Sequence, residues 1–151
     1  MKSIIITSLF VFLCSCDRTY DHGGLNWSHP SIEEMNWYDA QEYCKDLGRR
    51  LPTISELRGL IQDCPEAELG GSCRISDDCL SSIDCDYDKC CGCDFDWNDT
   101  GKYDSLGFGS ILWSSSVDSS DPDYVYLVFF DEASIGRHKK TYKCKVCCVK
   151  E

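Results

Sequence analysis

Apolar residues at helical spacing predict two short helices in the first half of the chain. The first is expected over residues 37–47, where one face carries apolar side chains every three or four residues. Asn36 is placed to cap its start, and Gly48 is placed to end it. The apolar face consists of Trp37, Ala40, Cys44 and Leu47.

The second predicted helix follows Pro52. Thr53 and Glu56 have the spacing of a capping box, in which each side chain accepts the other residue's backbone N–H. Its buried stripe consists of Ile54, Leu57, Leu60 and Ile61.

Period-two alternation, together with β-branched and aromatic residues, predicts strands elsewhere in the chain. The expected strands are residues 25–28, 111–113, 124–130, 133–135 and 142–149. The segment 124–130 is apolar at both odd and even positions, which is typical of a strand covered on both faces. We therefore expect this strand in the centre of the sheet, with a turn at Asp131 and Glu132 leading into its antiparallel partner.

Residues 63–104 show little periodicity and are rich in Gly, Ser, Asp and Cys. A loop this long in a small domain is functional, disordered or cross-linked, and disulfide cross-links are the expectation here. Its cysteines are Cys64, Cys73, Cys79, Cys85, Cys90, Cys91 and Cys93. A strand, two helices, this loop and then an antiparallel sheet together predict an α+β fold.

The N-terminus has the layout of a bacterial lipoprotein signal peptide. Lys2 supplies a positive charge, and residues 4–13 form an apolar run of about ten residues. Such a run is too short to span a membrane, which takes roughly twenty residues. The sequence Leu13-Cys14-Ser15-Cys16 resembles a lipobox, whose last cysteine is acylated and becomes the new N-terminus. An ordinary signal peptide with incidental cysteines is the alternative.

This interpretation divides the chain into a signal peptide at 1–15, acylated Cys16 with a polar tether at 16–24, and a domain at 25–151. We expect the protein in the cell envelope, outside the cytoplasm, with the lipid bilayer as its partner through the acyl chains. The choice between inner and outer membrane stays open, as does the oligomeric state.

Export would place the cysteines in an oxidising compartment, where closely spaced cysteines form disulfides more often than metal sites. Removal of residues 1–15 leaves 12 of the 13 cysteines, and acylation of Cys16 leaves an odd number for pairing. One thiol is therefore expected to stay free, to pair with another chain or to bind a further group.

The formal net charge of −11 changes which partners are expected. A strongly acidic net charge argues against binding of nucleic acid through its phosphates and against general adhesion of the protein surface to anionic membranes. The acyl chains, rather than the protein surface, would hold this protein at the bilayer.

Several segments, in their order and spacing, resemble the Lcl C-terminal domain family, which is named for a bacterial collagen-like adhesin. They are Trp37-x-x-Ala40, Tyr43-Cys44, Arg50-Leu51-Pro52-Thr53 with Glu56-Leu57 and Leu60, Trp113-Ser114-Ser115-Ser116, the aromatic strand at 124–130 and Cys148-Val149. The resemblance covers about residues 25–150. It implies a C-type-lectin-like fold, in which two helices pack on a small antiparallel sheet, and binding of sulfated glycans by the founding adhesin.

The resemblance also implies a disulfide between Cys44 and Cys148. Cys91, Cys144 and Cys147 lie outside the family pattern. The partners of the remaining loop cysteines stay open, and these cysteines are Cys64, Cys73, Cys79, Cys85, Cys90 and Cys93.

The concentrated positive region of the sequence is residues 137–140, followed by Lys143 and Lys145. Arginine can bind sulfate or carboxylate groups through two hydrogen bonds, and lysine can bind them as a point charge. A solvated charged surface is the alternative. The candidate ligand-binding residues are Arg137, Lys139 and Lys140, with Trp97 and Tyr103 as stacking aromatics. Phe108 and Trp113 are further stacking candidates, although Trp113 is more typical of a core residue.

In two acidic runs every second residue carries a side-chain oxygen, and calcium is bound by several such oxygen ligands. They are Asp84, Asp86 and Asp88, and Asp94, Asp96 and Asn98. Neither run has the glycine or the glutamate that an EF-hand requires, so turn-forming carboxylates are favoured. We assign no metal or cofactor, and calcium stays open. Cys90-x-x-Cys93 and Cys144-x-x-Cys147 have the spacing of a four-sulfur zinc site, but export favours disulfides.

No catalytic serine, histidine and aspartate arrangement and no paired acid in an apolar setting is evident, so we do not expect an enzyme. The expected function is recognition of a glycan, or of an envelope or host protein, in an adhesion-type role. Three alternatives remain: a purely structural envelope lipoprotein, a metal or redox protein, and a relative of the formylglycine-generating enzymes, which share the Arg-Leu-Pro-Thr run at 50–53.

Overall fold

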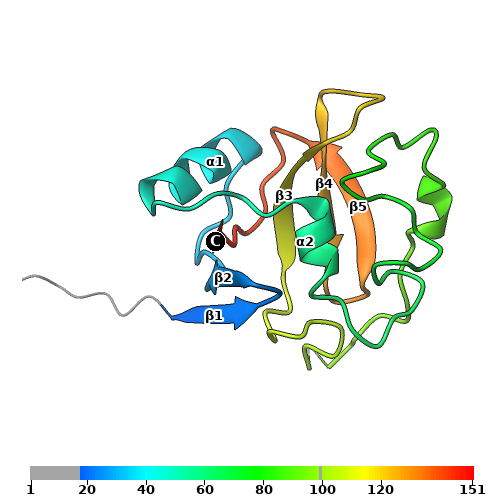
Figure 1. Ribbon diagram of the computed structural model, residues 1–151, viewed down its shortest axis with the longest axis horizontal. Coiled ribbons are helices and arrows are strands. Elements are labelled where there is room, and N and C mark those ends of the chain that lie inside the picture. Colours follow the sequence, from blue (N-terminus) through cyan, green and yellow to red (C-terminus); the bar gives the residue numbers. More distant parts are fainter. Residues whose placement is uncertain (1–17, 99) are drawn as a thin grey trace, which may run out of the picture.

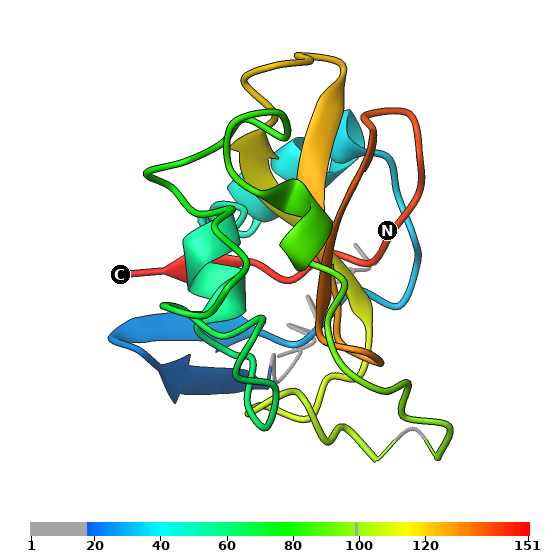
Figure 2. The same ribbon diagram turned by 90° about the vertical axis from the view of Figure 1, so that its right-hand side faces the viewer.

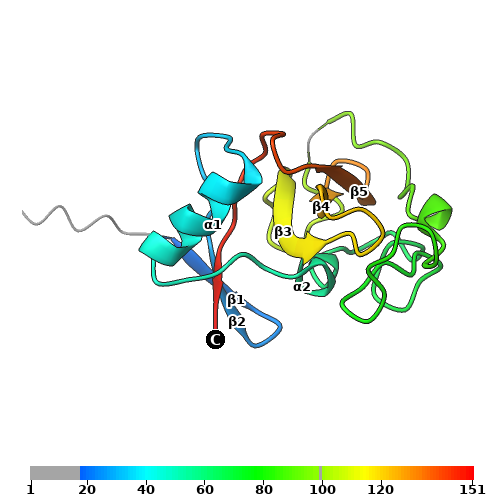
Figure 3. The same cartoon turned by 90° about the horizontal axis from the view of Figure 1, so that it is seen from above.

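The computed structural model describes residues 18–98 and 100–151, which form an α+β domain with two helices and two antiparallel sheets (Figure 1). The predicted signal peptide and acylation site lie outside these residues. Seen from above, helix α1 (Trp37–Asp46) and the first sheet lie on one side of strand β3 (Ile111–Val117), and a long loop lies on the other side of the domain (Figure 3). Within the described part of the chain, no helix has both the length and the apolar character needed to cross a membrane.

The first sheet joins the two ends of the domain. Its strand order is β1 (Thr19–His22), β2 (Leu25–Ser28) and β6 (Val149–Lys150). β2 has the bounds predicted for the first strand, but β1 lies in the segment predicted to be a tether, and that prediction is wrong. Gly23 and Gly24 both adopt positive φ, as the two-residue loop of a tight hairpin requires, and this turn pairs the polar β1 with β2.

The second sheet has the strand order β3, β4 (Tyr124–Phe129) and β5 (Ser134–Lys139). β4 is central, as predicted, and its four middle residues are buried. The turn that follows β4 leads into its antiparallel partner. By contrast, the long strand predicted at 142–149 is wrong, because only its last residue joins a strand.

The segment before β6 pairs with two separate parts of the chain. It makes isolated bridges from Cys144 to Met35, which precedes α1, and from Lys145 to Leu112 in β3. The alternating pattern of residues 142–149 therefore reflects burial on different sides of the domain rather than membership of a continuous ladder.

Both predicted helix starts are confirmed. The Asn36 side chain accepts hydrogen bonds from the first turn of α1, and Thr53 and Glu56 form a reciprocal capping box at the start of α2 (Ile54–Arg58). α2 is shorter than its apolar stripe suggests, although the whole predicted stripe is buried. α1 buries Ala40 and Cys44.

Three nested disulfides cross-link the long loop, which confirms the predicted stapling. They are Cys64–Cys93, Cys73–Cys90 and Cys79–Cys85. We call residues 63–104 the stapled loop. Its one short 3-10 helix, η1 (Tyr87–Lys89), lies in front of the β3–β4–β5 sheet in the view of Figure 2.

A fourth disulfide joins Cys44 on α1 to Cys148, the residue before β6, which is the pairing that the family resemblance implies. Three cysteines of the described chain remain as thiols, Cys91, Cys144 and Cys147, rather than the one that an odd count suggests. Cys144 and Cys147 are buried in two different hydrophobic clusters, which separates their side chains.

Candidate functional site

The predicted ligand residues lie at opposite ends of the second sheet. Trp97 belongs to a loop beside the turn between β4 and β5, where the Asp96 backbone N–H donates to the Asp131 carbonyl at 2.7 Å. Lys139 and Lys140 lie at the far end of β5, where its arrow ends in Figure 1. The structure therefore separates the predicted site into two surfaces.

Arg137 is engaged inside the protein rather than free to bind a ligand. Its guanidinium donates to the Asp118 carboxylate at 2.7 Å and lies 4.6 Å from the centre of the Tyr124 ring. Burial raises the pKa of Asp118, but hydrogen bonds from Ser120 and Ser82 outweigh it, and the resulting pKa is about 2. The assignment of Arg137 as a ligand-binding residue is corrected, because a buried, ionised carboxylate already holds its charge.

The end of β5 meets the start of α1. The Trp37 backbone N–H donates to the Lys140 carbonyl at 3.0 Å, and the Lys140 ammonium lies 4.8 Å from the centre of the Trp37 ring. The Trp37 indole N–H donates to the Ser114 carbonyl at 2.9 Å, which fixes the ring against β3. A lysine and an aromatic ring from distant parts of the sequence thus form one surface.

Three further ring-bearing side chains extend this surface. The rings of His138 and Tyr142 are stacked, with centres 4.1 Å apart and planes 14° from parallel. Tyr142 is 41% exposed, and Tyr38, in edge contact with Trp37, is 57% exposed. We name the group the α1–β5 surface, and it consists of Trp37, Tyr38, His138, Lys140 and Tyr142.

The sequence predicted the basic half of the α1–β5 surface but not its aromatic half. Trp37 is expected to face the core, and Tyr38 and Tyr142 belong to no motif in the sequence. The rings of His138 and Tyr142 among the basic residues of 137–145 are a usable signal. The contact between residues 37 and 140 depends on tertiary structure, so no local pattern could reveal it.

The second surface is the tip of the stapled loop. Trp97 is 86% exposed, and its ring centre lies 4.7 Å from that of the half-exposed Phe95. The Asp96 carboxylate accepts hydrogen bonds from the Thr100 hydroxyl at 2.6 Å and from the Thr100 backbone N–H at 2.8 Å. These bonds lower the pKa of Asp96, the Thr100 hydroxyl contributing most. The hydrogen bonds between Asp96 and Thr100 thus hold the loop in a turn that exposes Trp97.

Tyr103 is not part of an exposed surface. It is 1% exposed, and its hydroxyl donates to the Asp94 carbonyl at 2.7 Å. Its assignment as a stacking aromatic is corrected, because the ring packs inside the domain and closes the loop. Phe108 is half-buried against Tyr20, with ring centres 5.3 Å apart, and Trp113 is fully buried.

Three carboxylates of the acidic runs have partners within the chain. Asp96 holds its own loop, Asp84 accepts from the Ser81 hydroxyl at 2.7 Å, and Asp86 lies 4.0 Å from Lys89. Across residues 18–98 and 100–151, the one group of potential metal ligands is Cys64, Glu66 and Cys93, of which the two cysteines form a disulfide. Oxidised sulfur does not ligate zinc as a thiolate does.

The cysteines of the two C-x-x-C pairs do not form one site. Cys90 and Cys93 belong to different disulfides, while burial raises the pKa of both Cys144 and Cys147 to about 12. The Cys147 thiol donates to the Ser28 carbonyl at 2.9 Å. Thiols this weakly acidic are poor nucleophiles, so the arrangement does not favour thiol redox chemistry.

The described residues expose aromatic and basic side chains at two places. These places are the α1–β5 surface and the tip of the stapled loop. Comparison of the chain with protein-family models and with curated protein sequences finds no match.

Proposed function

We propose that the protein is an exported lipoprotein whose domain recognises a glycan through the α1–β5 surface, without catalysis. The observation that carries the proposal is the joining of Lys140 to Trp37 beside the stacked His138 and Tyr142. Aromatic faces carry partial negative charge and pack against the weakly positive C–H groups of a sugar ring. The neighbouring lysines would attract acidic substituents of the same glycan.

Four disulfides support a location outside the cytoplasm. Disulfides persist in oxidising compartments and are rare in the reducing cytoplasm. The lipobox-like sequence at residues 13–16 would add the acyl anchor. In this proposal the domain stands at the envelope surface, bound to the bilayer through Cys16 alone.

The C-type-lectin-like fold and membership of the Lcl C-terminal family are part of the same proposal. The Cys44–Cys148 disulfide and the meeting of the chain ends in one sheet support them. So does the long loop between the helices and the second sheet, since loops held by a rigid scaffold commonly carry binding residues.

A panel of purified glycans, neutral and acidic, tests the proposal when the protein is compared with its Lys140→Ala and Tyr142→Ala variants. We expect at least one acidic glycan to bind the wild type and to lose about tenfold or more in affinity with either variant. Lys150→Ala is the matched control, because it removes an exposed lysine from β6. Absence of binding across the panel, or equal binding by all variants, would reject the proposal.

The exposed Phe95–Trp97 pair favours a second candidate function, recognition of an envelope or host protein. An exposed tryptophan is a common centre of protein interfaces. Capture of a single protein by the wild type but not by a Trp97→Ala variant would support this candidate, and retention by both would oppose it.

A further inference from the structure

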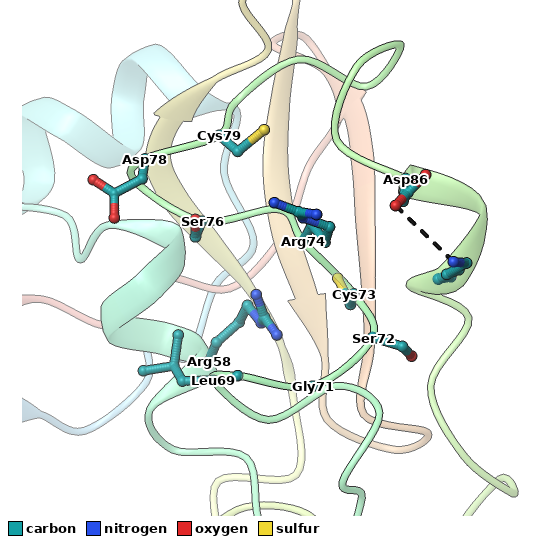
Figure 4. A pocket seen from close by; sticks show the side chains of 12 residues that line it. Arg58, Leu69, Gly71, Ser72, Cys73, Arg74, Ser76, Asp78, Cys79 and Asp86 are labelled. Carbon is teal, nitrogen blue, oxygen red and sulfur yellow. Dashed lines mark ion pairs between the residues drawn. The ribbon is translucent and has the colours of Figure 1, made fainter.

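A groove of about 710 Å³ lies in the stapled loop, away from both aromatic surfaces. Its volume is in the range of small-molecule sites. Three cationic side chains line it, Arg58, Arg74 and Lys89, with two acidic ones, Asp78 and Asp86 (Figure 4). One positive charge is therefore in excess in a groove of a protein whose net charge is −11.

Arg58 forms the floor of the groove and is 98% buried, with a relative exposure of 2%. Its guanidinium donates to the carbonyls of Ala67 at 2.8 Å, Glu68 at 2.6 Å and Ile75. Carbonyls orient a guanidinium but do not neutralise it, and no carboxylate pairs with Arg58 among the described residues. Burial accordingly lowers the pKa of Arg58. A buried cation without a counter-ion creates a positive potential in the space beside it.

Arg74 supplies a second guanidinium that is free to contact a ligand. It is exposed, and within residues 18–98 and 100–151 it has neither a hydrogen-bond partner nor an ion-pair partner. Figure 4 shows Arg58 and Arg74 toward the middle of the pocket and the Asp78 carboxylate directed away from them. Asp86 is the nearer acid to Lys89, at 4.0 Å.

Disulfides hold the walls of the groove in place. Cys73, beside Arg74, is joined to Cys90, beside Lys89, so the two outer cations lie on cross-linked segments. Cys79, which also lines the groove, is joined to Cys85. Fixed walls reduce the ordering cost of binding, which is the physical advantage of a preorganised site.

We propose that this groove binds the carboxylate of a small acidic ligand, with Arg74 and Lys89 contacting the carboxylate and Arg58 supplying positive potential from the floor. The fork of a guanidinium matches the two oxygens of a carboxylate. The single excess positive charge matches one carboxylate better than a doubly charged phosphate. The groove is separate from the α1–β5 surface, and its role does not depend on glycan recognition.

Titration of the ¹⁵N-labelled protein with sodium acetate, replacing sodium chloride at constant ionic strength, tests the proposal. The signals to follow are the arginine Nε–H groups and the backbone amides of residues 70–76. We expect saturable shifts with a dissociation constant on the order of millimolar. Shifts that grow linearly without saturation would overturn the assignment.

Variants separate a site from a general charge effect. Arg74→Gln and Lys89→Gln should each weaken acetate binding about tenfold, because each removes a charge-assisted hydrogen bond. Lys139→Gln makes the same charge change at an exposed position outside the groove and should leave binding unchanged. Both groove residues are exposed, so their variants are expected to fold, which the dispersion of the amide spectrum verifies.

A parallel titration with sodium phosphate tests the class of ligand. Acetate should bind at least as tightly as phosphate, because Asp78 and Asp86 oppose a second negative charge. Tighter binding of phosphate would overturn the carboxylate assignment, and equal acetate binding by wild type and Arg74→Gln would overturn the site itself.

Discussion

The backbone N–H of Trp37 donates to the carbonyl of Lys140 at 3.0 Å, and the side chains of the same two residues meet again as a cation above a ring. This pair joins the start of the first helix to the end of the last long strand. The aromatic residues of both segments consequently share one face of the protein, and that face carries the proposed function.

The Cys44–Cys148 disulfide closes a separation of 104 residues, and its loss should destabilise the domain more than loss of the Cys79–Cys85 disulfide, which closes 6. In the chain-entropy treatment the two cross-links contribute about 4.7 and about 2.4 kcal/mol. Denaturant unfolding of the paired Cys→Ala variants without reductant measures both. Equal destabilisation would contradict the dominance of the long-range link.

Cys91 should be the one thiol of the described chain that reacts in the folded protein. It is exposed, whereas Cys144 and Cys147 are buried and have pKa values raised to about 12. Alkylation before and after denaturation, followed by peptide mass spectrometry, distinguishes the three sites. Rapid native labelling of Cys144 or Cys147 would show that the core around the last segment opens.

Asp118 should make the stability of the domain depend on acid pH. Its folded pKa of about 2 is below the ordinary value of 3.8, so its contribution is complete above about pH 4 and is lost as the pH falls toward 2. The difference corresponds to about 2 kcal/mol. Urea unfolding at pH 7 and at pH 2.5 should show this loss in the wild type and a smaller one in Asp118→Asn, and equal losses would contradict the assignment.

Arg58 should be essential for the stability of the stapled loop, whichever ligand the groove binds. Arg58→Met leaves the buried carbonyls of Ala67 and Ile75 and the partly buried carbonyl of Glu68 without their donor, and should lower the free energy of unfolding by about 3 kcal/mol or more. Arg74→Met is the matched control, and its effect should stay within about 0.5 kcal/mol because Arg74 is exposed. Similar effects of the two variants would show that the carbonyl contacts of Arg58 contribute little.

Local rules predicted the elements whose signals are local. Asn36 and Thr53 start helices because their caps involve residues within three positions, and 124–130 is apolar on both faces because it is central. The hairpin strand β1 was not predicted, because Thr19–His22 is polar. Its strand conformation depends on the Gly23–Gly24 turn and on pairing with β2.

The site residues were harder to predict because they, too, depend on contacts with other segments of the chain. Whether a basic or aromatic side chain is free depends on partners far away in the sequence: Asp118 holds Arg137, and the Asp94 carbonyl holds Tyr103. Among the described residues Trp97 has no such distant partner, and it remains exposed, as predicted for a stacking residue. The aromatic half of the α1–β5 surface depends on the contact between Trp37 and Lys140, which no local pattern contains.

Calorimetric titration of the strongest glycan from the panel into two double variants tests the central claim most directly. Tyr38→Ala with Tyr142→Ala removes the exposed aromatics of the α1–β5 surface, and Phe95→Ala with Trp97→Ala removes those of the loop tip. Glycan recognition at the α1–β5 surface predicts a loss of about tenfold or more in the first double variant and a change within about twofold in the second. Full affinity in the first and loss in the second would place the binding site on the stapled loop and contradict the account.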